Sequence, residues 1–404
     1  MNLNIVGDDG ILTTHAITEK SFNDSRLAGH LGYIGASSKV SNALNIVKAY
    51  YSNAKVVLFD ESNQTIVELI KNLNIPKFGT DIEQKSIFDE KDFSSVYFTS
   101  GSTGYPAAAF KSKSNIESEV EALTILLQKQ KIKKVIVTVP FIHLYGTLLG
   151  LMYPLLNNID IYIKEHFLPN DILDMIDEHT MVVTTPLYIK ALNRLGEQKD
   201  LSNALFISST APLGTEDIIM FNTKFNADIV QIFGSTETGG IACKTNNEET
   251  WLPFDQVMIE MNEKNELKVR SPFVSETIYE NGFRTTSGVM QTFDYIEMQE
   301  DGFKLIGRSS KIFKLAGKRY STIQIENILE ELEDVKKALV FVEIDKDSLR
   351  GEYLDITLET TVHRTSKEIK NILKQRLSNL KFSIQLHCVS KIPTNQVGKK
   401  LRII

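Results

Sequence analysis

The chain has few cysteines and no long apolar run. Only two of its 404 residues are cysteines, Cys243 and Cys388, and they lie far apart in the sequence. This spacing argues against a disulfide framework and gives no metal-ligand motif. No apolar run approaches the length of a membrane span, and Met1–Gly10 lacks the basic and apolar regions of a secretion signal. We therefore expect a cytoplasmic protein without a membrane span.

The charge balance is uneven along the chain. The net charge is −6, but residues 311–404 hold 18 Lys+Arg against 12 Asp+Glu, whereas the preceding part holds 27 against 39. A basic C-terminal part could bind a polyanionic partner, such as a nucleotide thiol or an acidic carrier protein, or could simply be a solvated charged surface. Nucleic acid is disfavoured, because acidic residues are interspersed and no stacking-aromatic motif is present.

The hydrophobic pattern predicts an α/β protein. Buried-strand runs such as 56–59, 135–139 and 204–208 alternate with helical spacing over 41–53, 64–73 and 114–129. This alternation favours mostly parallel sheets covered by helices on both faces. Short strands and turns over about 251–308 predict a small β subdomain. We expect a large domain over 1–309 and a small α+β domain over 310–404, of a size that can fold alone.

A hydroxyl-rich glycine loop follows a predicted strand at 96–98. It consists of Thr99, Ser100, Gly101, Ser102, Thr103 and Gly104. Glycines let backbone N–H groups close around an anion, and the hydroxyls add donors, so the loop suits phosphate. It is not a Walker A loop, because no Gly-Lys-Ser/Thr follows and Pro106 interrupts any helix. The alternative is an ordinary Ser/Gly turn.

Two further clusters follow predicted strands. Phe233 and Gly234 lead into Ser235, Thr236 and Glu237, which places one carboxylate among hydroxyls. Such a set suits a magnesium ion beside a phosphate, although a capping glutamate in a turn would look the same. The other cluster, 141–146, holds His143 among aromatic and apolar residues at a strand end, where α/β sheets bind ligands. A structural histidine is the alternative there.

Taken together, these segments resemble the acyl/aryl-adenylate-forming, or AMP-binding, superfamily. The resemblance covers 96–404 and rests on five motifs in the family's order: the loop 99–104, the segment 140–146, the segment 233–237, Asp294 with Arg308, and Gly398-Lys399. It implies an α/β N-terminal domain with a small β subdomain, followed by a mobile α+β C-terminal domain that rotates about a hinge at Ser310.

The resemblance also implies a role for each motif. Residues 99–104, Ala211, Phe233 and Gly234 would bind the nucleotide, Thr236 would meet phosphate, and Glu237 would bind Mg²⁺. Asp294 and Arg308 would hold the ribose, and His143 would gate the acyl pocket. Lys399 would be the catalytic lysine of adenylation, which fits the need for a cation where two anions react.

Three features depart from the family pattern. Ala107 stands where the family usually has lysine. Lys111 or Lys113 could partly replace that cation, or pyrophosphate could be held less tightly. Ser310 replaces the usual hinge carboxylate. The phosphate loop also begins nearer the N-terminus than in full-length members, which predicts a trimmed N-terminal region and a less closed acyl site.

We therefore expect an ATP-dependent acid–thiol ligase that uses Mg²⁺. It would convert a fatty or aryl acid to acyl-AMP and transfer the acyl group to coenzyme A or to the phosphopantetheine of an acyl carrier protein. The trimmed N-terminal region favours the carrier protein by analogy alone. An amino acid is disfavoured, because the segment around His143 offers no carboxylate for an α-ammonium group. The alternative is a catalytically degenerate adenylation fold that binds AMP or a carrier protein.

Overall fold

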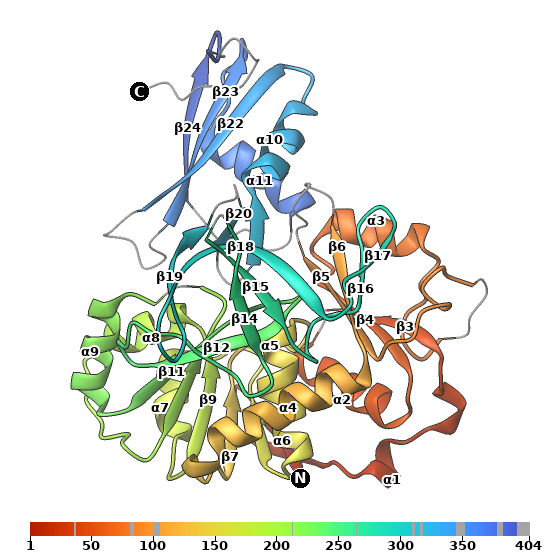
Figure 1. The fold of residues 1–404 in the computed structure, drawn as a ribbon, viewed down its shortest axis with the longest axis vertical. Coiled ribbons are helices and arrows are strands. Elements are labelled where there is room, and N and C mark those ends of the chain that lie inside the picture. The colour runs from red at the N-terminus through yellow and green to blue at the C-terminus, as the bar shows by residue number, and fades with distance from the viewer. Residues whose placement is uncertain are drawn as a thin grey trace.

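The computed structural model describes residues 1–35, 38–80, 85–99, 106–211, 213–263, 265–308, 312–315, 318–344, 352–377 and 383–393. The body of the molecule contains two large sheets and a smaller one, and the C-terminal elements rise above them (Figure 1). No described helix is long and apolar enough to cross a membrane.

The largest sheet has nine strands in the order β13-β12-β11-β10-β9-β7-β8-β1-β2. The six strands from β11 to β1 are parallel, and the strands at both edges add antiparallel. The bounds are β1 Asn2–Val6, β2 Leu12–Ala16, β7 Lys134–Val137, β8 Asp160–Ile163, β9 Thr180–Thr184, β10 Leu205–Ser208, β11 Asp228–Ser235, β12 Gly239–Thr245 and β13 Leu252–Pro253.

Both faces of this sheet are buried. Because side chains alternate along a strand, Val135 and Val137 of β7 pack in one core while Ile136 packs in another. The helices associated with this part of the chain are α4 Lys113–Leu127, α5 Leu144–Thr147, α6 Tyr153–Leu156, α7 Pro169–Met175, α8 Pro186–Asn193 and α9 Thr215–Phe225, with a π-helical turn over Leu148–Met152. The predicted parallel, doubly covered sheet is confirmed.

The second sheet has six strands in the order β17-β16-β6-β5-β4-β3. Its strands are β3 Leu31–Ile34, β4 Lys55–Leu58, β5 Ser95–Thr99, β6 Ala107–Lys111, β16 Thr277–Tyr279 and β17 Phe283–Thr285. Its helices are α2 Lys39–Tyr51 and α3 Gln64–Asn72, capped by Ser38 and Asn63, and a short α1 spans Glu19–Phe22. β5 and β6 are antiparallel neighbours, with Thr99 opposite Ala107, so the first glycine loop connects two paired strands.

The predicted β subdomain over 251–308 contributes to more than one sheet. Four strands form an antiparallel sheet in the order β14-β15-β18-β19, with bounds β14 Met258–Met261, β15 Glu266–Arg270, β18 Val289–Met298 and β19 Phe303–Arg308. β16 and β17 lie in the same range but hydrogen-bond to β6 in the six-stranded sheet. β13 likewise extends the nine-stranded sheet.

The C-terminal part has a core of its own. A hairpin of β20 Ile312–Leu315 and β21 Lys318–Ser321 precedes a three-stranded sheet of β22 Val335–Ile344, β23 Glu352–Thr360 and β24 Ser383–Val389. Helices α10 Thr322–Glu330 and α11 Ser366–Arg376 pack on that sheet through a cluster that includes Leu329, Leu354 and Leu373. The Thr65 hydroxyl donates to the Arg376 carbonyl at 3.1 Å, which joins α3 to the end of α11. The boundary at 309/310 stays a prediction, because residues 309–311 lie outside the described ranges.

Candidate active site

The predicted site residues gather after the carboxyl ends of neighbouring parallel strands. β7, β9, β10 and β11 lie in one sheet and point the same way, so the segments that follow them meet at one edge. His143 follows β7, Ala211 follows β10, and Thr236 and Glu237 follow β11. The sequence-predicted histidine and the Thr-Glu pair therefore belong to the same edge of the sheet.

The second glycine loop is a tight hairpin between β11 and β12. The Ser235 amide donates to the Thr238 hydroxyl at 3.0 Å, and the Thr238 amide donates to the Ser235 hydroxyl at 3.1 Å. The antiparallel register shifts between Phe233 and Gly234, so a bulge bends the strand just before the turn. This reciprocal bonding fixes the backbone, while the side chains of Thr236 and Glu237 remain partly exposed at the tip.

The backbone of Glu237 is held from two directions. Its carbonyl oxygen accepts from the Ser275 amide at 2.8 Å and from the Lys111 ammonium at 3.3 Å. Lys111 also donates to the Phe273 carbonyl at 2.5 Å, and its side chain is 1% exposed. The predicted use of Lys111 as a replacement loop cation is therefore wrong, because its ammonium is buried against backbone carbonyls.

The other lysine weighed for that replacement is directed elsewhere. The Lys113 ammonium donates to the Asn53 side-chain oxygen at 2.9 Å and lies 4.4 Å from the centre of the Tyr50 ring. Both partners belong to the C-terminal end of α2 or the turn after it. In this structure Lys113 therefore braces that end of the helix.

A buried glutamate accompanies Lys111, and sequence reasoning missed it. Glu119 of α4 is 4% exposed and accepts from the Gly240 amide at 2.6 Å. Burial raises the pKa of Glu119 to about 7, although Lys111 opposes that shift, and burial lowers the pKa of Lys111 to about 8. No local pattern in the sequence marked these two residues. Every residue of β6 is buried, so the strand lacks an alternation of buried and exposed positions.

Asp294 and Arg308 are brought opposite one another. Asp294 is 2% exposed on β18, and its Cα partner across the antiparallel ladder is Arg308 on β19. A register shift follows at Tyr295, so this pair also lies beside a bulge. The ring of Phe233 lies 5.9 Å from that of Phe303, which connects β11 to the same strand β19.

The segment around His143 is a strand end that turns into a short helix. His143 is the residue before α5, and its carbonyl accepts from the Thr147 amide at 2.9 Å. Phe141, the first residue of the predicted cluster 141–146, is fully buried in the core. A π-helical turn follows α5, a feature that often occurs near functional sites.

The Tyr145 side chain connects two strands at this edge of the sheet, a role that the motif alone did not reveal. Its hydroxyl lies 3.0 Å from the Thr184 carbonyl and 2.8 Å from the Ile207 carbonyl. These carbonyls end or nearly end β9 and β10, so one side chain spans two strands. Burial raises the pKa of Tyr145 well above its usual value, which keeps the hydroxyl protonated as the donor.

Ala211 follows a strained residue. Thr210 has φ of +81°, a left-handed value that is rare for a β-branched residue. Its hydroxyl oxygen is buried and has no hydrogen-bond partner among the described residues. Strain of this kind concentrates at functional sites. Thr210 lies two residues after β10 and next to Ala211, whose nucleotide contact stays a prediction.

Two of the predicted site motifs lie outside the described residues. These are Lys399 and the loop residues Ser100, Gly101, Ser102, Thr103 and Gly104. The backbone of Thr99 is described as the last residue of β5. In the described ranges, no group of three or more His, Cys, Asp or Glu side chains could hold a metal ion.

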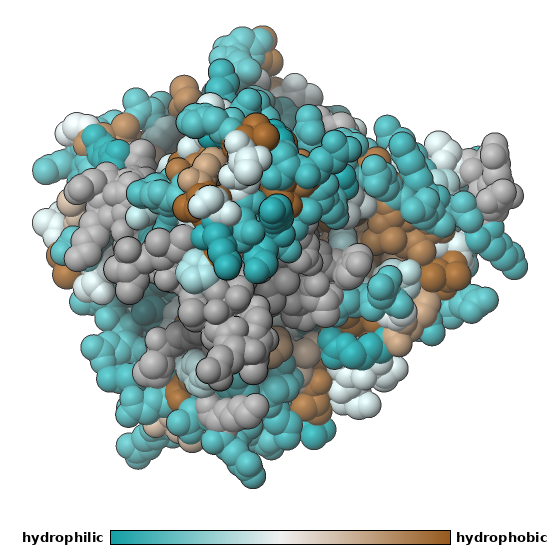
Figure 2. All heavy atoms as spheres, turned by 90° about the horizontal axis from the view of Figure 1, so that it is seen from above, coloured by the Kyte–Doolittle hydropathy of each residue, from teal (hydrophilic) through white to brown (hydrophobic). Residues whose placement is uncertain are grey.

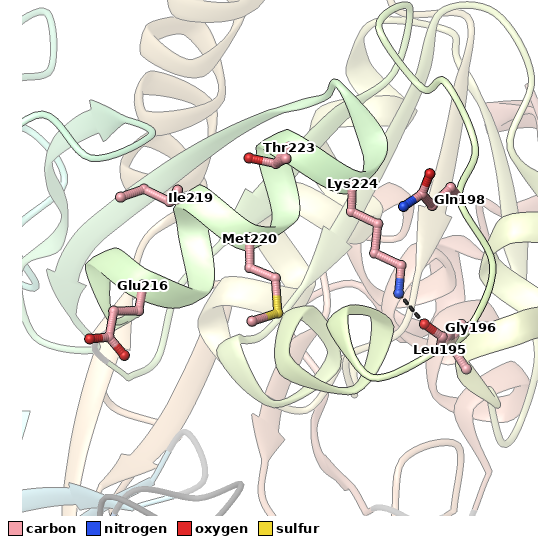
Figure 3. Close-up of a pocket in the computed structure, with 8 residues that line it drawn as sticks. All are labelled: Leu195, Gly196, Gln198, Glu216, Ile219, Met220, Thr223 and Lys224. Carbon is pink, nitrogen blue, oxygen red and sulfur yellow. Dashed lines mark hydrogen bonds between the residues drawn. The ribbon is translucent and has the colours of Figure 1, made fainter.

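A separate surface hollow lies along α8 and α9 and does not belong to this edge (Figure 3). Its volume is about 590 Å³, and its lining consists of Leu195, Gly196, Gln198, Glu216, Ile219, Met220, Thr223 and Lys224. The Lys224 ammonium donates to the carbonyls of Leu192, Asn193 and Leu195 at the end of α8. The Lys224 ammonium is therefore already bound by the protein, and its role in the hollow is structural.

Known proteins resemble this chain over most of its length. A probable 4-coumarate–CoA ligase of Dictyostelium discoideum is 25% identical over 410 residues, covering 90% of this chain and 74% of the relative. A long-chain-fatty-acid–CoA ligase of Bacillus subtilis is 24% identical over 397 residues, covering 88% and 70%. Among solved structures, an o-succinylbenzoate CoA synthetase of Bacillus subtilis superposes with a TM-score of 0.78 at 16% identity, covering 99% of this chain and 94% of that one.

The structural likeness supports the fold, and a sequence-family match identifies the family. The sequence model of the family described as "AMP-binding enzyme" matches residues 25–271. This range is more than half of the chain and includes both glycine loops and the His143 segment. The chain therefore belongs to the AMP-binding enzyme family, as its motifs predicted.

Proposed function

We propose that this protein is an AMP-forming acid–CoA ligase. The observation that carries the proposal is the hairpin that presents Thr236 and Glu237 at the same sheet edge as the His143 segment. Family membership and relatives whose names denote CoA ligases support it.

The proposed reaction has two steps. A carboxylate oxygen attacks the α-phosphorus of ATP, the bond to the β-phosphate oxygen breaks, and pyrophosphate leaves. The thiolate sulfur of the acceptor then attacks the acyl carbonyl carbon, and AMP leaves with the oxygen that had joined acyl group and phosphorus. The first step brings two anions together, so the site must supply positive charge and hydrogen-bond donors.

The described residues fit a magnesium ion held jointly with the nucleotide. Mg²⁺ prefers oxygen ligands and usually takes one or two carboxylates together with substrate phosphates and water. Glu237 would be that carboxylate, beside the hydroxyl of Thr236. When bound, the ion would neutralise phosphate charge. The protein's own part is to keep Glu237 at the tip of a fixed hairpin.

The remaining roles are assigned by position. Asp294, buried opposite Arg308, would accept hydrogen bonds from the ribose hydroxyls. His143, at the entrance to α5, would border the acyl group. Residues 99–104 and Lys399 would bind phosphate and steer the carboxylate, and both assignments rest on the sequence motifs.

The acyl substrate is proposed to be a fatty or aryl acid without an α-amino group. The surroundings of His143 are apolar, and 140–146 contains no carboxylate to pair with an ammonium group. The names of the two curated relatives, a coumarate ligase and a long-chain fatty acid ligase, agree with this class.

CoA is the acceptor favoured here over the expected carrier protein. The relatives are named as CoA ligases, and residues 311–404 carry an excess of basic side chains that suits a phosphorylated nucleotide thiol. The end of the molecule that carries the C-terminal part is mainly hydrophilic where it is coloured, with hydrophobic residues in separate groups (Figure 2). A carrier protein stays a prediction for the second arm of the assay.

Acid-dependent exchange of labelled pyrophosphate into ATP tests the proposal. Aliphatic and aromatic acids are supplied with MgATP, and product formation is followed in parallel with CoA and with a phosphopantetheinylated carrier protein. We expect exchange with at least one acid and acyl transfer to CoA. Folded protein that exchanges with none of the acids but binds AMP would instead be the degenerate adenylation fold.

The variant Lys399→Ala separates these two functions. A ligase needs the Lys399 cation only where the carboxylate attacks the α-phosphate of ATP. Adenylate formation should therefore fall by about 100-fold or more while AMP binding persists. Exchange rates give the first quantity and equilibrium dialysis of AMP the second. Exchange equal to that of the unmodified protein would contradict the role of Lys399.

A further inference from the structure

Two buried side chains of opposite charge, Lys111 and Glu119, hydrogen-bond to the backbone of the hairpin that carries Glu237. Among the lysines and arginines whose burial the structure describes, only Lys111 is buried, and Glu119 is buried as well. Neither charge is used in the proposed reaction. Burying two charges costs several kcal/mol per ion, and apolar residues of similar size often serve stability as well or better. The pair therefore calls for a reason other than stability.

The two side chains hold the hairpin at its tip and at the start of β12. Lys111 donates to the carbonyl of Glu237 itself at 3.3 Å and to that of Phe273 at 2.5 Å. Glu119 accepts from the amide of Gly240 at 2.6 Å, three residues further on. Hydrogen bonds to charged groups are roughly twice as strong as neutral ones. The tip of the turn is thus tied to β6 and the start of β12 to α4, two elements from other parts of the fold.

The glycines of the loop leave room for this arrangement. A Cβ atom on Gly239 would lie 2.5 Å from a carboxylate oxygen of Glu119 and 2.8 Å from the Cβ of Phe273. A Cβ on Gly240 would lie 3.1 Å from the other carboxylate oxygen and 2.3 Å from the Phe254 ring. The close approach of Glu119 therefore depends on glycine at two successive positions.

We propose that Lys111 and Glu119 are positioning residues that fix the backbone of Glu237, so that its carboxylate and the Thr236 hydroxyl point at the nucleotide. This inference rests on the proposed function for its catalytic meaning. Its structural content, an anchored hairpin, holds independently of turnover. The two side chains act through the peptide backbone and have no role in contact with the substrate.

The test uses the double variant Lys111→Met with Glu119→Gln. Glutamine keeps an acceptor for the Gly240 amide, and methionine fills the lysine volume without donating to the two carbonyls. We expect the double variant to fold and to need about tenfold more Mg²⁺ for half-maximal pyrophosphate exchange. The KM for the carboxylic acid should change less than twofold, because the acyl side of the site is untouched. A general loss of folded enzyme would lower the rate without moving the Mg²⁺ requirement.

Lys224→Met is the matched control. Lys224 also donates its ammonium to backbone carbonyls, but it does so at the end of α8, away from the hairpin. This variant should keep the Mg²⁺ requirement of the unmodified protein. An equal shift in both variants would overturn the proposal, because it would show that removing any carbonyl-bound lysine has the same effect.

Amide hydrogen exchange provides the second readout and requires no activity. The Ser275 amide, which donates to the same Glu237 carbonyl, should exchange at least tenfold faster in the double variant and unchanged in Lys224→Met. Absence of pyrophosphate exchange that depends on a carboxylic acid, in the unmodified protein, would overturn the ligase. Unchanged protection of the Ser275 amide from hydrogen exchange in the double variant would overturn the anchoring of the hairpin.

Discussion

At the scale of single residues, Thr210 has a backbone conformation that is unfavourable for its side chain. A φ of +81° costs a β-branched residue about 1–2 kcal/mol, and a buried hydroxyl without a partner adds a desolvation penalty. Thr210→Gly removes both costs and loses part of the gain to chain entropy. We expect its free energy of unfolding to rise by about 1 kcal/mol, measured by urea denaturation.

Thr210→Ala is the control for that prediction. Alanine removes the orphan hydroxyl but keeps a Cβ at a left-handed φ, so its gain should be smaller than that of glycine. A glycine variant less stable than the threonine protein would show that the side chain contributes more through packing than it costs through strain.

Individual site residues were predictable only where a motif marks them. Glu237, Asp294 and Arg308 stand at fixed places in recognisable segments, and the structure puts the last two opposite one another. Glu119 carries no such mark, because it lies on an amphipathic helix where a glutamate usually faces solvent. Its burial depends on the approach of Gly239 and Gly240 from more than a hundred residues away, which no local pattern contains.

At the scale of elements, the β11–β12 hairpin is the most constrained unit of the site. Gly239 has φ of +72° and no space for a Cβ, whereas Gly10 has a similar φ of +78° with nothing within 4 Å. We expect Gly239→Ala to destabilise the protein by about 2–4 kcal/mol and Gly10→Ala by about 1 kcal/mol. Thermal and urea unfolding of both variants measure the difference, which isolates crowding from backbone strain. Equal costs would contradict the close packing of Glu119 and Phe273.

Elements were predicted well where their periodicity is strong. The expected strand 56–59 and helix 64–73 correspond to β4 and α3 within one residue, since a short apolar run and a capped amphipathic helix depend on local sequence. The assignment of strands to sheets was not predictable. β16 lies within the predicted β subdomain in sequence but pairs with β6, because strand pairing is decided by long-range hydrogen bonding.

At the scale of the whole molecule, the buried pair should shape how stability depends on pH. The pKa of Glu119 is raised to about 7, so between its ordinary pKa and 7 the unfolded chain loses a proton that the folded chain keeps, and stability falls as pH rises. The pKa of Lys111 is lowered to about 8, so above 8 the unfolded chain holds the extra proton, and stability rises with pH. The pair therefore penalises folding most between pH 7 and 8.

The double variant Lys111→Met with Glu119→Gln makes that contribution measurable. Neither new side chain titrates, so the difference in unfolding free energy, variant minus unmodified protein, should reach its maximum between pH 7 and 8 and decline on both sides. Titratable groups away from the two substituted positions are common to both proteins and cancel to first order. A difference that is flat from pH 5 to 10 would refute the burial of two charges at this place.

The central claim is that the molecule joins a carboxylic acid to AMP before any thiol reacts. An acid labelled with ¹⁸O at both carboxylate oxygens distinguishes this route directly. One of these oxygens becomes bonded to the α-phosphorus and leaves with AMP. After turnover with MgATP and CoA, mass spectrometry of the recovered AMP should show one ¹⁸O atom per molecule. AMP without the label, or label in released inorganic phosphate, would contradict adenylate formation by this protein.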